Sequence, residues 1–198
     1  MITWIRNKFA PTFYVQIWEN KLRVTDLSTK NKYESLPVIA IETLESGEKK
    51  IVAIGRQATT NTQPNIVTVN PFSHPRVLFS DFYVGEKLLQ HAFSTFAKYR
   101  FLRVTPKTVI HPMEKTDGGL TMIEIRAFRE LALGAGSIES KVYVGEPLSI
   151  ASFSFEDIED TDGVNDLNAN HATKGETGLA FTLFVVLMLI GVFYFGAK

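Results

Sequence analysis

The sequence predicts an α/β domain, a mixed sheet flanked by helices, followed by one C-terminal transmembrane helix. Apolar residues recur at strand spacing early in the chain and at helical spacing in two later segments. The stretch from Gly178 to Gly196, GLAFTLFVVLMLIGVFYFG, contains no charged residue and is long enough to cross the hydrocarbon core of a bilayer as a helix. A buried core helix is the alternative, which is disfavoured because such helices usually carry a polar face.

The composition limits the chemistry that the chain can perform. Its 198 residues carry 21 basic and 21 acidic side chains, so the net charge implies neither nucleic acid nor an acidic surface as a partner. Cysteine is absent, which excludes disulfides, thiolate metal sites and a cysteine nucleophile. We expect no metal or other cofactor. The histidines show no ligand spacing, and each is expected in a loop or on a helix surface: His74, His91, His111 and His171.

Strand patterns come first in the chain. Residues 13–18 and 22–27 flank a polar turn and predict a hairpin. Residues 36–41 predict a third strand of the same meander, and residues 51–55 predict a short strand added at its edge. The irregular connection that follows contains one more short strand pattern, at 66–69.

The first helix has the clearest periodicity in the chain. Ser80 or Asp81 is placed to cap it. Apolar residues recur at every fourth position to form its buried face: Val84, Leu88, Ala92 and Phe96. A short strand is expected after it, at 107–110.

The second helix opens with a capping box made by Thr121 and Glu124. The glycines of residues 134–136 end it. Residues 141–144 predict a last strand, and Pro147 begins a third helix. An antiparallel meander followed by two crossover units makes a mixed sheet with helices on its faces, which is the ribonuclease-H-like order.

The chain is predicted to have four parts. Residues 1–12 are expected to form an amphipathic segment, with a frayed terminus as the alternative; residues 13–155 form the folded domain. Residues 156–177 begin with an acidic run and predict a flexible linker, and residues 178–196 predict the transmembrane helix. The side chains expected to anchor it in the bilayer begin at Gly178 and continue with Leu183, Phe184, Leu187, Leu189, Ile190, Phe193 and Tyr194.

Four stretches, in order, resemble the bacterial actin family MreB. They are ESLPVIAI at 34–41, VAIGRQA at 52–58, FSDFYVGEKLLQHAF at 79–93 and IEIRAFRELALGAGSIESKVYVGEP at 123–147. The resemblance covers roughly residues 2–152, which corresponds to the first half of an MreB molecule. It implies an actin-type half-domain.

The departures from the family concern its ATP site. The family's first phosphate loop, Asp-Leu-Gly-Thr, matches the positions of Gln16, Ile17, Trp18 and Glu19. These residues lose the metal-side carboxylate and the glycine that lets backbone N–H groups approach phosphate. Gly145 stands where the family has its catalytic glutamate, and the second phosphate loop and adenosine pocket have no counterpart after residue 152. The resemblance therefore implies a chain without catalytic residues or a bound nucleotide, a pseudo-ATPase rather than an enzyme.

The expected function is structural. A tail-anchored MreB-like domain would interact with full-length MreB filaments or with the cell-shape machinery, without hydrolysing ATP. One alternative is a degenerate remnant with no activity. Another is a metal-dependent enzyme on the ribonuclease-H-like sheet, for which the strands offer only Asp26, Glu34 and Glu42.

The same features predict where the protein resides. The N-terminus has no apolar stretch of signal-peptide length, so insertion of the tail is expected to leave the domain in the cytoplasm. We therefore expect a single-pass protein of the bacterial inner membrane, with its domain facing the cytoplasm.

Overall fold

The computed structural model describes residues 10–61, 63–97 and 105–161, which all belong to one compact unit. Among these residues, no helix combines the length and the apolar character needed to cross a membrane. The predicted transmembrane helix at 178–196 lies outside the described residues. So do most of the predicted amphipathic segment at 1–12 and the greater part of the predicted linker.

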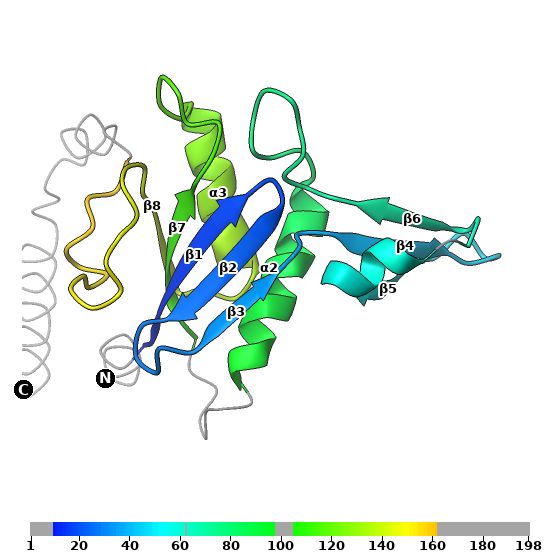
Figure 1. The fold of residues 1–198 in the computed structure, drawn as a ribbon, viewed down its shortest axis with the longest axis horizontal. Coiled ribbons are helices and arrows are strands. Elements are labelled where there is room, and N and C mark those ends of the chain that lie inside the picture. Colours follow the sequence, from blue (N-terminus) through cyan, green and yellow to red (C-terminus); the bar gives the residue numbers. More distant parts are fainter. Residues whose placement is uncertain (1–9, 62, 98–104, 162–198) are drawn as a thin grey trace, which may run out of the picture. The chain divides into compact units, whose positions relative to one another are not determined.

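The unit is built on a five-stranded sheet with the strand order β3-β2-β1-β7-β8 (Figure 1). Its strands are β1 (Thr12–Trp18), β2 (Lys21–Asp26), β3 (Lys32–Ser35), β7 (Lys107–Pro112) and β8 (Glu139–Val142). The first three pair antiparallel, whereas β7 pairs parallel with both β1 and β8. The predicted mixed sheet and its opening hairpin are confirmed.

A second sheet has three strands in the order β5-β4-β6. It contains β4 (Ile39–Thr43), β5 (Lys49–Ile54) and β6 (Ile66–Val69), with the short 3-10 helix η1 (Gly55–Thr60) after β5. The meander prediction is therefore wrong in its third strand, because β3 pairs with β2 and residues 39–43 belong to the other sheet. Pro37 separates the two strands, since it has no N–H to donate to a ladder. The exposed edge strand β3 lacked the apolar alternation that would have revealed it.

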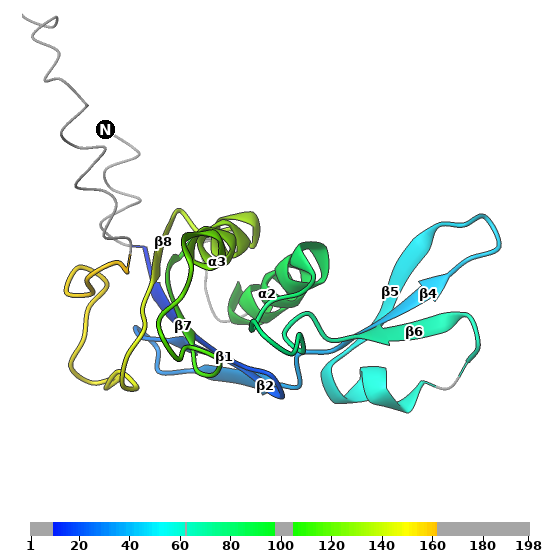
Figure 2. The ribbon, with the colours of Figure 1, turned by 90° about the horizontal axis from the view of Figure 1, so that it is seen from above.

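Both helices, α2 (Phe82–Ala97) and α3 (Met122–Gly134), lie on one face of the larger sheet (Figure 2). The Val84 N–H donates to the Asp81 carboxylate at 3.0 Å, which confirms Asp81 as a cap. The predicted capping box is also present, because Thr121 and Glu124 each accept from the other's backbone. The buried helix faces pack against alternate residues of β1, which are Phe13, Val15 and Ile17.

On the opposite face of the sheet, the described segment 147–161 packs without forming a helix. The prediction of a helix from Pro147 is wrong, because residues 147–161 form only turns, bends and irregular chain. Phe155 and Ile158 of this segment are buried against Tyr14 and Val109. Its serines favour local turns by bonding nearby backbone groups, so hydrophobic burial rather than helix formation fixes its path. Among the described residues, the α-helices thus lie on one face of the sheet only.

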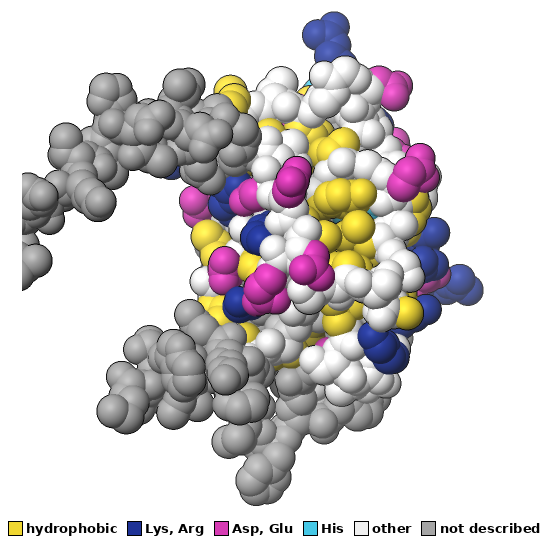
Figure 3. Space-filling view, turned by 90° about the vertical axis from the view of Figure 1, so that its left-hand side faces the viewer, with side chains coloured by type: hydrophobic (Ala, Val, Ile, Leu, Met, Phe, Trp, Pro, Cys, Tyr) yellow, Lys and Arg dark blue, Asp and Glu magenta, His cyan; other side chains and the backbone are white. Residues whose placement is uncertain are grey.

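Residues 156–161, which begin the predicted linker, are held on the sheet by charged groups. Lys107 pairs with Glu156 at 2.8 Å, and Arg129 pairs with Asp160 at 2.8 Å. Lys141 Nζ donates to the carbonyl oxygens of Phe155 and Ile158, at 3.0 and 2.8 Å. Figure 3 views this side of the molecule, where acidic and basic side chains are interleaved around apolar ones. The packed unit therefore continues to residue 161.

We predict that Phe155→Ala lowers the free energy of unfolding by about 3–5 kcal/mol, because it removes a fully buried aromatic side chain. The Phe155 ring is 2% exposed and lies 5.0 Å from Lys107 Nζ and 4.7 Å from Lys141 Nζ. Urea denaturation of the full chain in detergent measures the change. The exposed Ser152→Ala is the matched control, and an equally small effect of both variants would contradict the packing of this segment.

Candidate functional site

The carboxyl ends of β1, β7 and β8 meet at one edge of the sheet, which is where ligands usually bind in sheets of this kind. The residues at the phosphate-loop positions lie here. Gln16, Ile17 and Trp18 end β1, and Glu19 begins the turn to β2. The structure therefore places the predicted site residues at the edge where a nucleotide site would be sought.

The three residues that end β1 offer nothing that suits a metal-bound phosphate. Ile17 is fully buried in the core beneath the helices. Gln16 is 6% exposed, and its Nε2 atom points to Met113 Sδ at 3.7 Å. Trp18 lies beneath Lys21, whose Nζ is 3.9 Å from the ring centroid. A buried amide and a bulky ring therefore stand where the phosphate loop needs a carboxylate and a glycine.

The polar groups of Glu19 are all bonded within the chain. Its backbone N–H donates to the Glu114 carboxylate at 2.7 Å, and its own carboxylate pairs with Lys115 at 2.8 Å. Its carbonyl oxygen accepts from Asn70 Nδ2 at 2.8 Å. A phosphate that approached this amide would have to displace a carboxylate. The Glu114 carboxylate therefore already binds the N–H of the turn where a phosphate would bind.

Gly145, at the position of the family's catalytic glutamate, stands in a backbone conformation that favours glycine, with φ of 155°. A Cβ atom added there would lie 2.6 Å from the Tyr143 hydroxyl oxygen. Any larger residue would therefore require Tyr143 to move. The neighbouring Glu146 is exposed, and its carbonyl oxygen accepts a hydrogen bond from that same hydroxyl at 3.1 Å.

His111 on β7 links β1 to the segment after β8 through two hydrogen bonds. Its Nε2 lies 3.0 Å from the Gly145 carbonyl oxygen, so this nitrogen carries the proton and donates it. Its Nδ1, 2.6 Å from the Tyr14 hydroxyl, then accepts. Tyr14 also accepts from the Leu148 N–H at 3.2 Å. A buried Tyr-His pair thus holds the segment 145–148 against β1 and β7.

Burial sets the protonation of this pair. It lowers the pKa of His111, although the bond to Gly145 and the charge of Glu146 act in the opposite direction. Burial also raises the pKa of Tyr14. Both side chains are therefore neutral near pH 7.

The sequence did not reveal the position of His111, which is 1% exposed inside a strand rather than in a loop or on a helix. His74 and His91 follow the prediction, in a loop and on α2, and His171 lies outside the described residues. The signal that could have located His111 is its spacing of two from Val109, which places both side chains on one face of β7.

The carboxylates considered for a metal-dependent enzyme are not brought together. Asp26 accepts from the Ser28 N–H at 2.9 Å, and Glu34 pairs with Arg23 at 2.7 Å. Glu42 lies in the smaller sheet and accepts from Asn65. Within the described ranges, no group of three histidine or carboxylate side chains is placed to hold a metal ion.

Comparisons with known proteins relate the chain to MreB. It is 34% identical over 119 residues to the cell shape-determining protein MreB of Pasteurella multocida, covering 58% of this chain and 32% of that protein. The Escherichia coli K12 protein of that name is 32% identical over 118 residues, with the same coverage of each chain. No protein-family model matches the chain. It is thus a relative of MreB that spans about a third of the length of these relatives.

Solved structures give the same fold. MreB5 of Spiroplasma citri bound to ADP superposes with a TM-score of 0.53 at 17% identity, covering 69% of this chain and 39% of that one. A non-polymerising mutant of MamK bound to AMPPNP gives 0.52 at 13% identity, with 68% and 41% covered. The actin-like fold expected from the sequence is therefore confirmed.

We predict that the stability of the domain falls as the pH decreases below about 6.5. The His111 pKa is lower when folded than the ordinary value of 6.5, so the unfolded chain binds more protons below that value. The stabilisation is complete above this pH and is lost as the pH falls through the folded pKa. Urea denaturation of the full chain at a series of pH values between about 5 and 8 measures this.

His111→Gln is the control, because glutamine keeps a donor and an acceptor but does not titrate. The variant is expected to show a flatter pH dependence than the parent between the same limits. Parallel pH curves for the two proteins would contradict the assignment of the effect to His111.

Proposed function

We propose that this protein is a membrane-anchored, MreB-like accessory of the cell-shape cytoskeleton that does not hydrolyse ATP. Its relation to proteins named cell shape-determining protein MreB supports the cytoskeletal role. The apolar segment at 178–196 supports the anchor, and the proposed partner, a cytoskeletal filament, places the domain on the cytoplasmic face of the inner membrane.

The proposal that the protein does not hydrolyse ATP rests on the turn after β1, whose Glu19 N–H is already hydrogen-bonded. The Glu114 carboxylate accepts a hydrogen bond from the Glu19 backbone N–H. In a phosphate loop, such an N–H must stay free to bind phosphate. The second carboxylate, on Glu19 itself, would repel a phosphate at the same place. Tyr143 fills the space beside Gly145, where a catalytic glutamate would have to stand. All three features act against a nucleotide at this edge of the sheet.

A protein of this kind would act by contact rather than by chemistry. We infer that its domain engages full-length MreB filaments or their assembly machinery through an exposed surface. A spanning helix anchors far more firmly than an interfacial helix, so the domain would hold such a partner at the membrane. Recruiting or limiting filaments in this way requires no nucleotide.

We predict that magnesium-ATP titrated into the full chain in detergent gives no saturable heat, because the Glu19 amide and the space beside Gly145 are already filled. Isothermal calorimetry measures this. Full-length MreB under the same conditions is the positive control. A saturable signal from this chain would overturn the non-hydrolysing part of the proposal and leave the cytoskeletal part untouched.

We predict that the N-terminally tagged protein forms membrane patches that coincide with labelled MreB in cells. The patches are expected to become diffuse when MreB is depolymerised, because the filament rather than the lipid positions them. Deleting residues 178–198 is expected to release the protein from the membrane. A uniform membrane signal that is indifferent to MreB would contradict the cytoskeletal role, and membrane localisation without the tail would contradict the anchor.

A further inference from the structure

The face of the larger sheet opposite the helices is covered unevenly. Phe155 and Ile158 lie over β1 and β7, whereas the strands β2 and β3 carry charged side chains on the same face. The register places Arg23 beside Gln16 on one side and Glu34 on the other, and Lys21 beside Trp18. This part of the face is polar and accessible, since Glu34 is exposed and Arg23 is half-buried.

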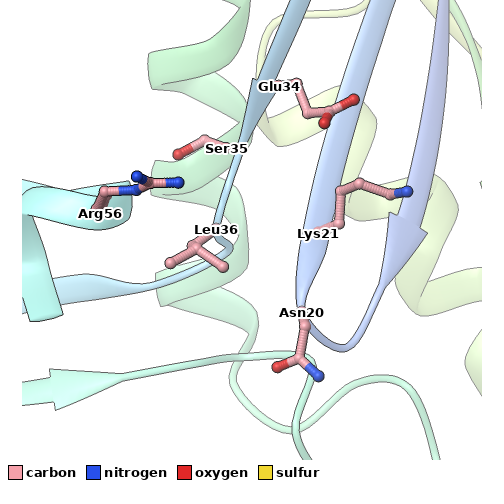
Figure 4. Close-up of a pocket in the computed structure, with 6 residues that line it drawn as sticks. All are labelled: Asn20, Lys21, Glu34, Ser35, Leu36 and Arg56. Atoms are coloured by element: carbon pink, nitrogen blue, oxygen red, sulfur yellow. The ribbon is translucent and has the colours of Figure 1, made fainter.

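A pocket of about 280 Å³ opens where this face meets the smaller sheet (Figure 4). The lining residues come from the β1–β2 turn, β2, the end of β3 and η1, and they are Asn20, Lys21, Glu34, Ser35, Leu36 and Arg56. Figure 4 shows Arg56 entering from η1, with Ser35 and Leu36 between it and Lys21, whose amine points away from Arg56. Two residues with cationic side chains therefore line this polar hollow, which we call the Lys21–Arg56 pocket.

The wall that carries Arg56 is fixed by a close backbone approach. Gly55 adopts a φ of +71°, and a Cβ atom on it would collide with the Ser35 hydroxyl. Its N–H donates to the Val38 carbonyl oxygen at 2.8 Å. A glycine is therefore required for η1 to come this close to the end of β3, and that approach brings Arg56 to the pocket.

The side chains around the pocket carry an excess of positive charge. Glu34 forms an ion pair with Arg23 at 2.7 Å, and the hydrogen bond from Arg23 holds the pKa of Glu34 below its usual value. Lys21 rests on the Trp18 ring and, like Arg56, has no carboxylate within ion-pair distance in the described part of the chain. The net charge of zero for the whole chain gave no sign of this local excess of positive charge.

We propose that the Lys21–Arg56 pocket binds an acidic peptide segment of a partner protein, with separate carboxylates of the peptide beside Arg56 and beside Lys21. Between the two cations, Leu36 offers an apolar contact for the peptide, while Asn20 and Ser35 offer hydrogen bonds. Opposite charge at such a surface favours encounter and selects the partner. The inference is independent of the filament proposal, because it rests on the charges of this pocket alone.

A nucleic acid suits the same surface less well. Single strands bind by stacking bases on aromatic rings along a continuous cationic groove. Lys21 occupies a face of the Trp18 ring at 3.9 Å, which leaves that face closed to a base. Glu34 also interrupts the cations and would repel a phosphate backbone. A peptide with separated carboxylates avoids both obstacles.

The test uses the full chain in detergent and a fluorescently labelled oligoglutamate peptide, with binding measured by fluorescence anisotropy. We expect saturable binding at low salt that weakens as salt is added, because exposed charges are screened. Arg56→Glu is expected to weaken it about tenfold or more. Lys49→Glu, at an exposed position that begins β5 and does not line the pocket, makes the same charge change and is expected to leave binding unchanged.

Three results would overturn the proposal. They are a lack of saturable binding by the parent chain, an equal loss of binding in the two variants, and tighter binding of a labelled oligothymidylate than of the peptide. Because Arg56 is exposed, its substitution is not expected to unfold the domain. Lys21→Gln provides a second variant that removes one cation from the other wall, and it should also weaken the peptide. None of these results bears on whether the protein colocalises with MreB.

Discussion

The parallel pairing of β1 with β7 is the constraint on which the rest of the domain depends. Residues 12–17 of β1 pair with residues 107–112 of β7, although about a hundred residues separate them in the chain. This pairing buries β1 on both faces, since its odd-numbered side chains meet the helices and Tyr14 meets the segment 147–161. A parallel pair needs a crossover connection, and α2 lies in it. The central strand thus fixes the positions of both layers.

The same pairing creates the edge at which a nucleotide would be sought and bonds its polar groups to one another. It brings Glu114 beside the Glu19 amide and His111 beside Tyr14. Each of these bonds satisfies a polar group that a ligand would otherwise use. A turn whose amide is bonded to a carboxylate gains stability without a ligand, because a buried unpaired N–H is costly. The hydrogen bonds that complete this fold are therefore also the ones on which our proposal of a non-hydrolysing protein rests.

What remains available for recognition lies away from this edge. The segment 147–161 covers the sheet over β1 and β7, and Lys107, Lys141 and Arg129 hold it there. The strands β2 and β3 and the neighbouring η1 present their charged side chains to solvent. If the domain binds no nucleotide, as we propose, it still offers a charged surface on which a protein could bind.

The sequence by itself determined the elements that local patterns encode. The hairpin of β1 and β2, the buried face of α2 and the Thr121–Glu124 capping box each depend on residues close together in the chain. Four stretches that resemble MreB were enough to predict the actin-like fold, and the conspicuous apolar run at 178–196 was enough to predict an anchor. Periods of 2 and 3.6 residues are visible in sequence because the side chains of one element share one buried face.

Only the tertiary structure decided the features that join distant residues. It divided the strands between two sheets, buried His111, and placed Glu114 on an amide 95 residues earlier. It also folded residues 147–161 onto the sheet without a helix and brought Arg56 to the pocket that Lys21 also lines. These features depend on which surfaces meet, and the energy of such contacts comes from burial and from pairing between elements. No local period in the sequence records that information.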